Sequence, residues 1–231
     1  YNASHDEASR ILIYKDGEKE PHEIKRVLFG QMDFSNSGRY LAFSSLSSVE
    51  KKEQHSEVYY YDVQERKLFR VFPKRKRHIA MRATDPAYSP VDGGNRWLVM
   101  VRNHIDTDQL YVFDTLEKKG YYLTNEPRFT QFSNPRFSPN GKNIVVSRKD
   151  PQTGFRDIVM YSNTGTKLKN ITKDFHKDAH PIYSRDGSKI YYSSFQSGVA
   201  NIHAYHLKTG KTKQVSNVLT CLLYTSDAAD E

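Results

Sequence analysis

Four residues in the second half of the chain have the side chains and the spacing of a metal site. The stretch DFHKDAH places them at alternate positions: Asp174, His176, Asp178 and His180. Alternate side chains of an extended backbone lie on one face, and carboxylate with imidazole suits Zn²⁺ or Mn²⁺. The stretch reads as a linker between repeated segments, where a solvated loop is the ordinary outcome. We therefore predict no bound metal and no other cofactor.

The sequence lacks the short motifs that carry the commonest kinds of catalysis. It contains no Gly-x-Ser-x-Gly nucleophile elbow, no glycine-rich phosphate loop, no HExxH helix and no CxxC pair. We therefore predict no catalytic residue in this chain.

The chain is basic, with 35 Lys and Arg against 27 Asp and Glu and a formal net charge of +8. Its densest positive run is PKRKRH, residues 73–78. A charge run without interleaved stacking aromatics is weak support for base recognition, so we interpret it as a solvated connector and predict no nucleic-acid partner. No stretch approaches 18 uninterrupted apolar residues, which excludes a membrane-spanning helix.

A repeat of an aromatic residue, a short turn and an apolar strand runs through the chain. Its copies are FSNSGRYLAFS, YSPVDGGNRWLVMV, FSPNGKNIVVS and YSRDGSKIYYS, which start at Phe34, Tyr88, Phe137 and Tyr183. The separations of 54, 49 and 46 residues lie in the range of propeller blades. Asn, Asp and Gly tolerate the backbone angles of tight turns. The predicted structural turn residues are Gly38, Asp92, Gly93, Asn140, Gly141, Asp186 and Gly187.

Each copy contains four short strands separated by hairpin signals, as in NPRFS, KNIVVSR, RDIVMYS and TKLKNIT. The 16 Tyr and 12 Phe also favour strands. We predict an all-β chain: an incomplete ring, or β-propeller arc, of about four complete four-stranded antiparallel blades after a partial one. The predicted blades cover residues 11–26 (partial), 27–84, 85–133, 134–178 and 179–220. Residues 221–231 look like translated sequencing adapter, and we exclude them from the fold.

In a propeller the first strand of each blade lines a central channel. The residues three positions before the landmark aromatics are all polar: Gln31, Asp85, Asn134 and His180. We predict that they line the channel or a ligand site at its mouth. The alternative is that they satisfy backbone groups or bind channel water, as most buried polar groups do.

The repeated aromatic-Ser-Pro-Asp-Gly-Lys turn with its apolar strand resembles the TolB-like, WD-repeat-like β-propeller family. It is also similar to the propellers of prolyl-oligopeptidase-type serine peptidases. The resemblance covers residues 11 to 216. Two turns depart from the pattern, since Asn36 and Arg185 stand where the family has proline. Both remain acceptable turns.

The resemblance implies a non-enzymatic, protein-binding scaffold like the periplasmic component of the bacterial Tol-Pal envelope system. Its partner would then be a peptidoglycan-associated lipoprotein, and its signal peptide would precede the present residues. One alternative is the propeller of a serine peptidase whose catalytic domain lies outside the chain. An oligogalacturonate-lyase-type enzyme is a third reading. A Gly-x-Ser-x-Gly segment downstream would favour the peptidase, and a small α/β domain upstream would favour the scaffold.

Overall fold

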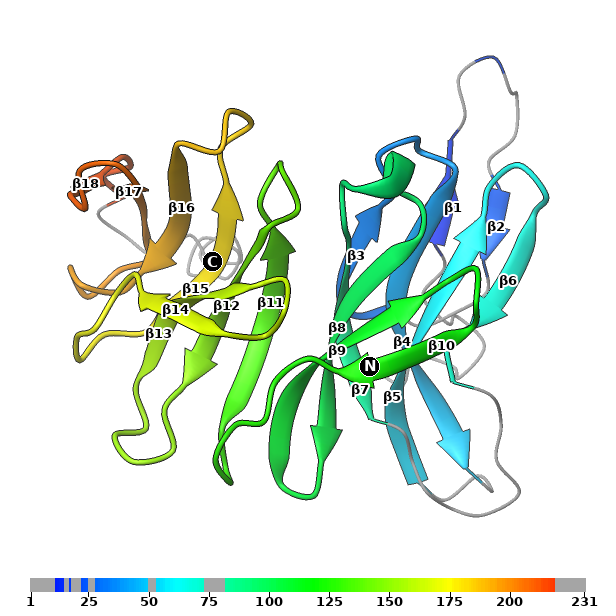
Figure 1. Cartoon of the computed structure of the whole chain (residues 1–231), viewed down its shortest axis with the longest axis horizontal. Coiled ribbons are helices and arrows are strands. Elements are labelled where there is room, and N and C mark those ends of the chain that lie inside the picture. Colours follow the sequence, from blue (N-terminus) through cyan, green and yellow to red (C-terminus); the bar gives the residue numbers. More distant parts are fainter. Residues whose placement is uncertain are drawn as a thin grey trace, which may run out of the picture. The chain divides into compact units, whose positions relative to one another are not determined.

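The computed structural model describes residues 11–14, 17, 22–24, 28–49, 53–72 and 82–218. The basic run 73–78 and the tail 221–231 lie outside these residues. The chain divides into two compact units, Tyr1–Phe129 (unit 1) and Thr130–Glu231 (unit 2), and each is described by itself (Figure 1). No helix long and apolar enough to cross a membrane occurs in the part of the chain that the structure describes.

Unit 1 contains two four-stranded antiparallel sheets and a two-stranded hairpin. Its first sheet consists of β3 (Leu28–Phe34), β4 (Tyr40–Val49), β5 (Glu53–Asp62) and β6 (Lys67–Arg70). Its second consists of β7 (Ala83–Tyr88), β8 (Trp97–His104), β9 (Thr107–Asp114) and β10 (Lys119–Tyr122). The one-turn 3-10 helix η1 (Asp92–Gly94) lies between β7 and β8. The hairpin pairs β1 (Ile11–Ile13) with β2 (His22–Ile24).

Unit 2 contains two further sheets of the same kind. One consists of β11 (Gln131–Phe137), β12 (Asn143–Lys149), β13 (Arg156–Ser162) and β14 (Lys167–Asn170). The other consists of β15 (Asp178–Tyr183), β16 (Lys189–Ser194), β17 (Asn201–His206) and β18 (Thr212–Gln214). Strands adjacent in sequence pair in every sheet, so each is a meander. The prediction of an all-β chain with four complete blades and a partial one is confirmed.

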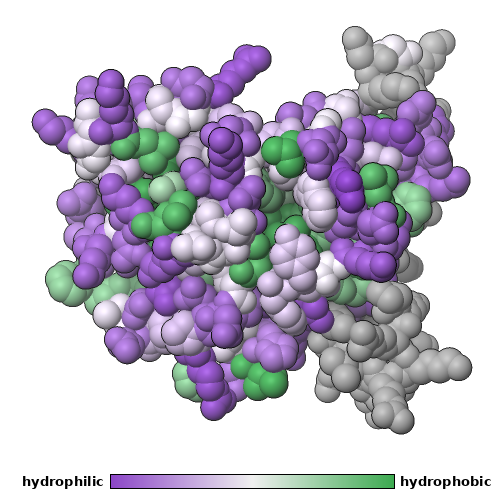
Figure 2. Space-filling model, in the orientation of Figure 1, coloured by the Kyte–Doolittle hydropathy of each residue, from purple (hydrophilic) through white to green (hydrophobic). Residues whose placement is uncertain are grey.

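The third strand of the first blade is buried on both faces over its second half. In β5, Val58 and Tyr60 enter the apolar cluster between the two sheets of unit 1, whereas Tyr59 and Tyr61 pack with residues of β1 and β2. The strand is therefore continuously apolar, as expected where both faces are covered. The last strand of each blade is more polar and exposed, and hydrophilic side chains cover most of the surface in Figure 2.

The repeated turn depends on its serine and glycine, which explains why its proline is dispensable. Ser138 Oγ accepts a hydrogen bond from the Asn143 N–H at 2.9 Å, and the Gly141 N–H donates to the Ser138 carbonyl at 2.8 Å. Gly141 has a φ of 68°, which glycine adopts without strain. The same two bonds hold the turns that begin at Ser35 and Ser184. These are the two turns that lack the family proline.

A bulge interrupts the first strand of every complete blade, because its pairing with the second strand shifts register. In β7, β11 and β15 the bulge contains Asp85, Asn134 and His180 with φ of 52°, 57° and 54°. Asp, Asn and His are the non-glycine residues enriched in this left-handed region. In β3 the equivalent place is taken by Gly30, with a φ of 77°. A bulge re-aims the side chain that it carries.

Candidate functional site

The four predicted channel residues lie at or beside these bulges but differ in exposure. Asp85 and Asn134 are each 7% exposed, Gln31 is half-buried, and His180 is exposed. The His180 Nδ1 lies 3.5 Å from the Ser193 hydroxyl. Because the four residues are divided between two units, their role in a common channel stays a prediction.

Asp85 connects the two blades of unit 1. Its Oδ1 accepts a hydrogen bond from the Gln31 N–H at 3.2 Å, and its own N–H donates to Ser44 Oγ at 3.0 Å. A Cβ at Gly30 would lie 2.6 Å from this carboxylate oxygen. The carboxylate therefore closes the junction between β3 and β7, which fits the alternative that a predicted channel residue satisfies backbone groups.

The four metal-ligand candidates do not all come together. One group of carboxylates has its oxygens within 4.8 Å of one another, and it contains Asp174, Asp178 and, from β13, Asp157. His176 Nδ1 instead lies 3.3 Å from Asp174 Oδ1. The bulge in β15 breaks the alternation that a straight extended segment would have, and Asp178 is buried while His180 is exposed.

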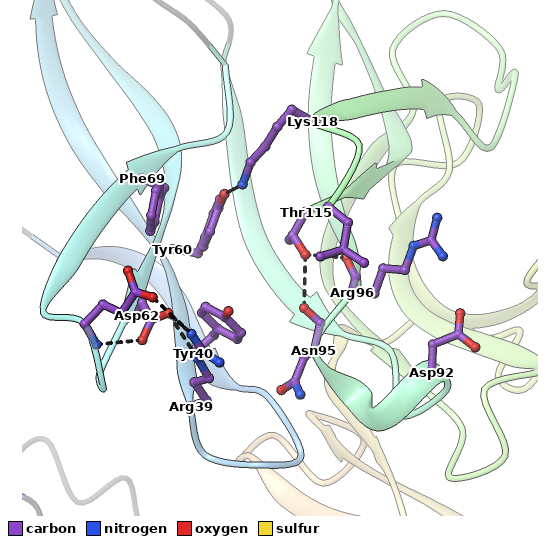
Figure 3. Close-up of a pocket in the computed structure, with 12 residues that line it drawn as sticks. Arg39, Tyr40, Tyr60, Asp62, Phe69, Asp92, Asn95, Arg96, Thr115 and Lys118 are labelled. Carbon is purple, nitrogen blue, oxygen red and sulfur yellow. Dashed lines mark hydrogen bonds and ion pairs between the residues drawn. The ribbon is translucent and has the colours of Figure 1, made fainter.

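A pocket between the two blades of unit 1 was not predicted from the sequence. Its volume is about 690 Å³. Figure 3 shows the rings of Tyr40, Tyr60 and Phe69 on one side and Lys118 reaching across to Tyr60 from the other blade. The residues that give it this character are Arg39, Tyr40, Tyr60, Phe69, Arg96 and Lys118.

Two arginine–aspartate pairs hold the pocket in shape. Arg39 donates from Nε and Nη2 to Asp62 Oδ2 at 3.1 and 2.9 Å, and Arg96 donates in the same way to Asp114 Oδ2 at 2.9 and 2.7 Å. Burial raises the pKa of Asp62, but hydrogen bonds from Arg39 and the backbone outweigh it, and the net pKa is lowered. The hydrogen bond from Arg96 is the main cause that lowers the pKa of Asp114.

Lys118 differs from both arginines. Among the described residues, no carboxylate lies within ion-pair distance of its ammonium, whereas each arginine pairs with an aspartate. Its ammonium donates to the Tyr60 hydroxyl and lies 4.7 Å from the Tyr60 ring centre and 5.0 Å from that of Phe69. Loss of water around the ammonium lowers the pKa of Lys118, against the raising effect of Asp114. Burial raises the pKa of Tyr60 to about 12. The phenol of Tyr60 is therefore a neutral hydroxyl at neutral pH.

The pocket has the chemistry of a binding site. Apart from the tyrosines, Thr115 is the lining residue with a side-chain hydroxyl. This hydroxyl lies 3.0 and 2.9 Å from the carbonyl oxygens of Asn95 and Arg96, which share it as a donor. The lining contains neither serine, cysteine nor histidine. It offers aromatic faces, a lysine ammonium and two guanidinium groups beside the carboxylates of Asp62, Glu65 and Asp92.

The repeat itself contains the signal that could have revealed the pocket. Tyr40 pairs with Asp62, and Trp97 pairs with Asp114, at the same register of their blades. The arginine before each aromatic, Arg39 or Arg96, therefore meets the aspartate that ends the third strand. Aligning the repeats on the whole blade, and not on the turn alone, would have predicted both pairs.

Solved structures of known proteins share the fold of this chain. No protein-family profile matches the sequence. TolB from Acinetobacter baumannii superposes with a TM-score of 0.66 and 18% identity over 89% of this chain and 48% of that one. A putative TolB from Agrobacterium tumefaciens gives a TM-score of 0.67 and 16% identity over 89% and 73% of the two chains. The chain thus spans about half the length of the first of these proteins.

A prolyl endopeptidase is equally similar in structure. It superposes with a TM-score of 0.66 and 11% identity over 90% of this chain and 30% of its own. At these identities the comparisons show the fold alone: an incomplete β-propeller of the type shared by TolB and prolyl-oligopeptidase-type peptidases. The resemblance predicted from the repeated turn is confirmed at that level.

Proposed function

We propose that the chain is a non-enzymatic propeller scaffold that binds a protein partner. The observation that carries this proposal is the pocket of unit 1. The Lys118 ammonium and the rings of Tyr60 and Phe69 form a surface of contacting side chains from both blades. Tyrosine is among the residues that dominate the binding energy of protein interfaces.

The partner segment that fits the pocket has an acidic side chain beside an apolar one. The acidic group would pair with Lys118, because the guanidinium groups of Arg39 and Arg96 already hold aspartates. By analogy with the TolB neighbours, we propose the soluble domain of a peptidoglycan-associated lipoprotein as this partner and the periplasm as the place of binding.

Isothermal titration calorimetry of the chain with that soluble domain tests the proposal. Lys118→Met keeps the stem of the side chain over the rings and removes the charge, and we expect the Kd to rise about tenfold. Lys119→Met is the matched control, because Lys119 is an exposed neighbour that does not line the pocket. Its Kd should stay within about twofold of the original value.

Two results would count against this function. The first is the absence of heat at any concentration with the folded chain. The second is an equal loss of affinity in Lys118→Met and Lys119→Met, since binding would then follow net charge and not the pocket.

A second candidate is the propeller domain of a prolyl-oligopeptidase-type peptidase. The prolyl endopeptidase matches the chain as well as TolB does, which favours this candidate independently. The coding sequence next to that of the chain distinguishes the two. A following hydrolase domain with a Gly-x-Ser-x-Gly elbow supports the peptidase, and its serine should then react with a fluorophosphonate probe in the full-length protein.

A further inference from the structure

Three aspartates meet where the two blades of unit 2 join. Asp157 lies near the start of β13, Asp174 lies in the connection after β14, and Asp178 is the first residue of β15. Their carboxylate oxygens lie within 4.8 Å of one another. The group therefore spans two neighbouring blades, and it is separate from the pocket of unit 1.

Asp178 is the most unusual member of the group. It is 0% exposed, and neither of its carboxylate oxygens has a hydrogen-bond partner. The hydroxyls of Ser194 and Thr172 are close enough to favour its charged form, but neither makes a hydrogen bond of ordinary geometry. A buried carboxylate that has given up water and lacks well-formed hydrogen bonds is costly.

At the position of Asp157 the first blade has Glu57, whereas two other blades have an amide. Gln109 Oε1 accepts from the Glu126 N–H at 2.9 Å, and its Nε2 donates to the Glu126 carbonyl at 3.2 Å. In the same way Asn201 accepts from the Val218 N–H and donates to the Val218 carbonyl. Both amides use their donor and their acceptor to fix the chain that leaves the blade.

Asp157 repeats only half of this arrangement. Its Oδ1 accepts from the Thr172 hydroxyl and from the Asp174 N–H, both at 3.3 Å. A carboxylate has no hydrogen to donate, so the second half of the amide clamp is missing. In its place stand two more carboxylates, those of Asp174 and Asp178.

The charges of the group are not balanced by protein cations. Among the described residues, no lysine or arginine lies within ion-pair distance of the three aspartates, and the one nearby imidazole, His176, contacts Asp174 alone. Burial and the neighbouring carboxylates raise the pKa of Asp157 and Asp178. Three adjacent carboxylates of this kind need a positive partner.

We propose that Asp157, Asp174 and Asp178 bind a Ca²⁺ ion that ties β13 to β15. Ca²⁺ takes six to eight oxygen ligands at about 2.3–2.6 Å, so oxygens on opposite sides of the ion lie about 5 Å apart. The group has oxygen ligands only, which disfavours Zn²⁺. Asp174 has a side chain 38% exposed, which leaves room for water to complete the coordination.

The test is calorimetric titration of the chelator-treated chain with CaCl₂, with the melting temperature followed in parallel. We expect saturable binding of one ion and a rise in Tm of several degrees at saturation, because the ion binds only the folded state. Asp157→Asn and Asp174→Asn should each raise the Kd at least about tenfold. Asp186→Asn is the control, since this exposed aspartate lies in a turn of the same unit and outside the group.

Asp174→Asn keeps the test informative if the buried positions tolerate no change, because Asp174 lies in an exposed connection. The proposal is overturned if CaCl₂ releases no heat and leaves Tm unchanged, or if MgCl₂ acts as strongly as CaCl₂. It is also overturned if Asp178→Asn stabilises the chain while calcium has no effect, since the carboxylates would then be held by protons. The outcome does not depend on the proposed protein partner.

Discussion

The two units share one blade plan but carry different polar groups at equivalent registers. At the end of the third strand, unit 1 has Asp62 and Asp114, and each is bound by an arginine of the same blade. Unit 2 has Ser162 and His206 at these places, paired in register with Asn143 and Lys189. Among the described residues, the arginine–aspartate pairs at the end of the third strand therefore occur in unit 1 and not in unit 2.

The opposite ends of the strands differ in another way. At this register each unit has one amide and one acid: unit 1 has Gln109 and Glu57, and unit 2 has Asn201 and Asp157. Among the described residues, only Asp157 stands in a group with two further aspartates. The junction of unit 1 thus opens into a pocket with both cations and carboxylates, whereas the junction of unit 2 brings carboxylates together. The apolar positions and turn residues are constrained by the blade, while the polar strand ends are free to specialise.

The largest effects should come from what the two units have in common. Leu98 and Ile158 are each 0% exposed and lie in the apolar clusters of units 1 and 2. Leu98→Ala and Ile158→Ala should each lower the free energy of unfolding by about 2–5 kcal/mol, because each leaves a cavity. Urea denaturation followed by tyrosine fluorescence measures this loss.

Leu116→Ala serves as the control, since Leu116 is 69% exposed and should cost less than about 0.5 kcal/mol. The prediction would be wrong if Ile158→Ala left the free energy of unfolding unchanged while Leu98→Ala lowered it strongly. The two clusters would then not be equivalent interiors.

A smaller effect should distinguish the units through pH. Asp114 has a lowered pKa in the folded chain, so its contribution to stability is present above the unfolded aspartate pKa of about 3.9 and is lost as pH falls through the folded value. Asp114→Asn should lower the free energy of unfolding by about 2 kcal/mol at pH 7, because charged hydrogen bonds from Arg96 are lost. Urea titrations at a series of pH values should show this difference shrinking below pH 4.

The matched control is Asp106→Asn, whose carboxylate is 59% exposed and forms only a surface pair with Arg128. It should change stability by less than about 1 kcal/mol at any pH. If the gap between the original chain and Asp114→Asn stayed constant down to pH 2, the ion pair would not be its source.

The fold could be predicted from the sequence because its determinants are local and repeated. The aromatic-Ser-x-x-Gly turn, exemplified by Ser138 and Gly141, fixes three of the four hairpins by bonds within six residues, and a longer variant closes the second blade, so four copies of the signal predict four blades. The bulges at Asp85, Asn134 and His180 were marked by their polar character but not by their left-handed backbone, which depends on pairing between strands.

The candidate sites were harder to predict because they join residues distant in sequence. Lys118 reaches Tyr60 from the next blade, and Asp157 meets Asp178 across a junction. The alternation argument for Asp174 to His180 assumed a straight strand and included no residue from β13. Such contacts follow from blade-to-blade packing, which no single stretch of sequence encodes.

The smallest effect concerns the bulge that uses glycine. Gly30 and Gly154 have similar φ values, 77° and 74°, but a Cβ at Gly30 would lie 2.6 Å from Asp85 Oδ1, whereas one at Gly154 meets nothing within 4 Å. Both alanine variants pay about 1 kcal/mol for a left-handed backbone. Gly30→Ala must also displace the Asp85 carboxylate from the Gln31 N–H, which adds about 1 kcal/mol. Equal unfolding free energies for Gly30→Ala and Gly154→Ala in urea would show that Asp85 moves without cost and does not hold the blade junction of unit 1.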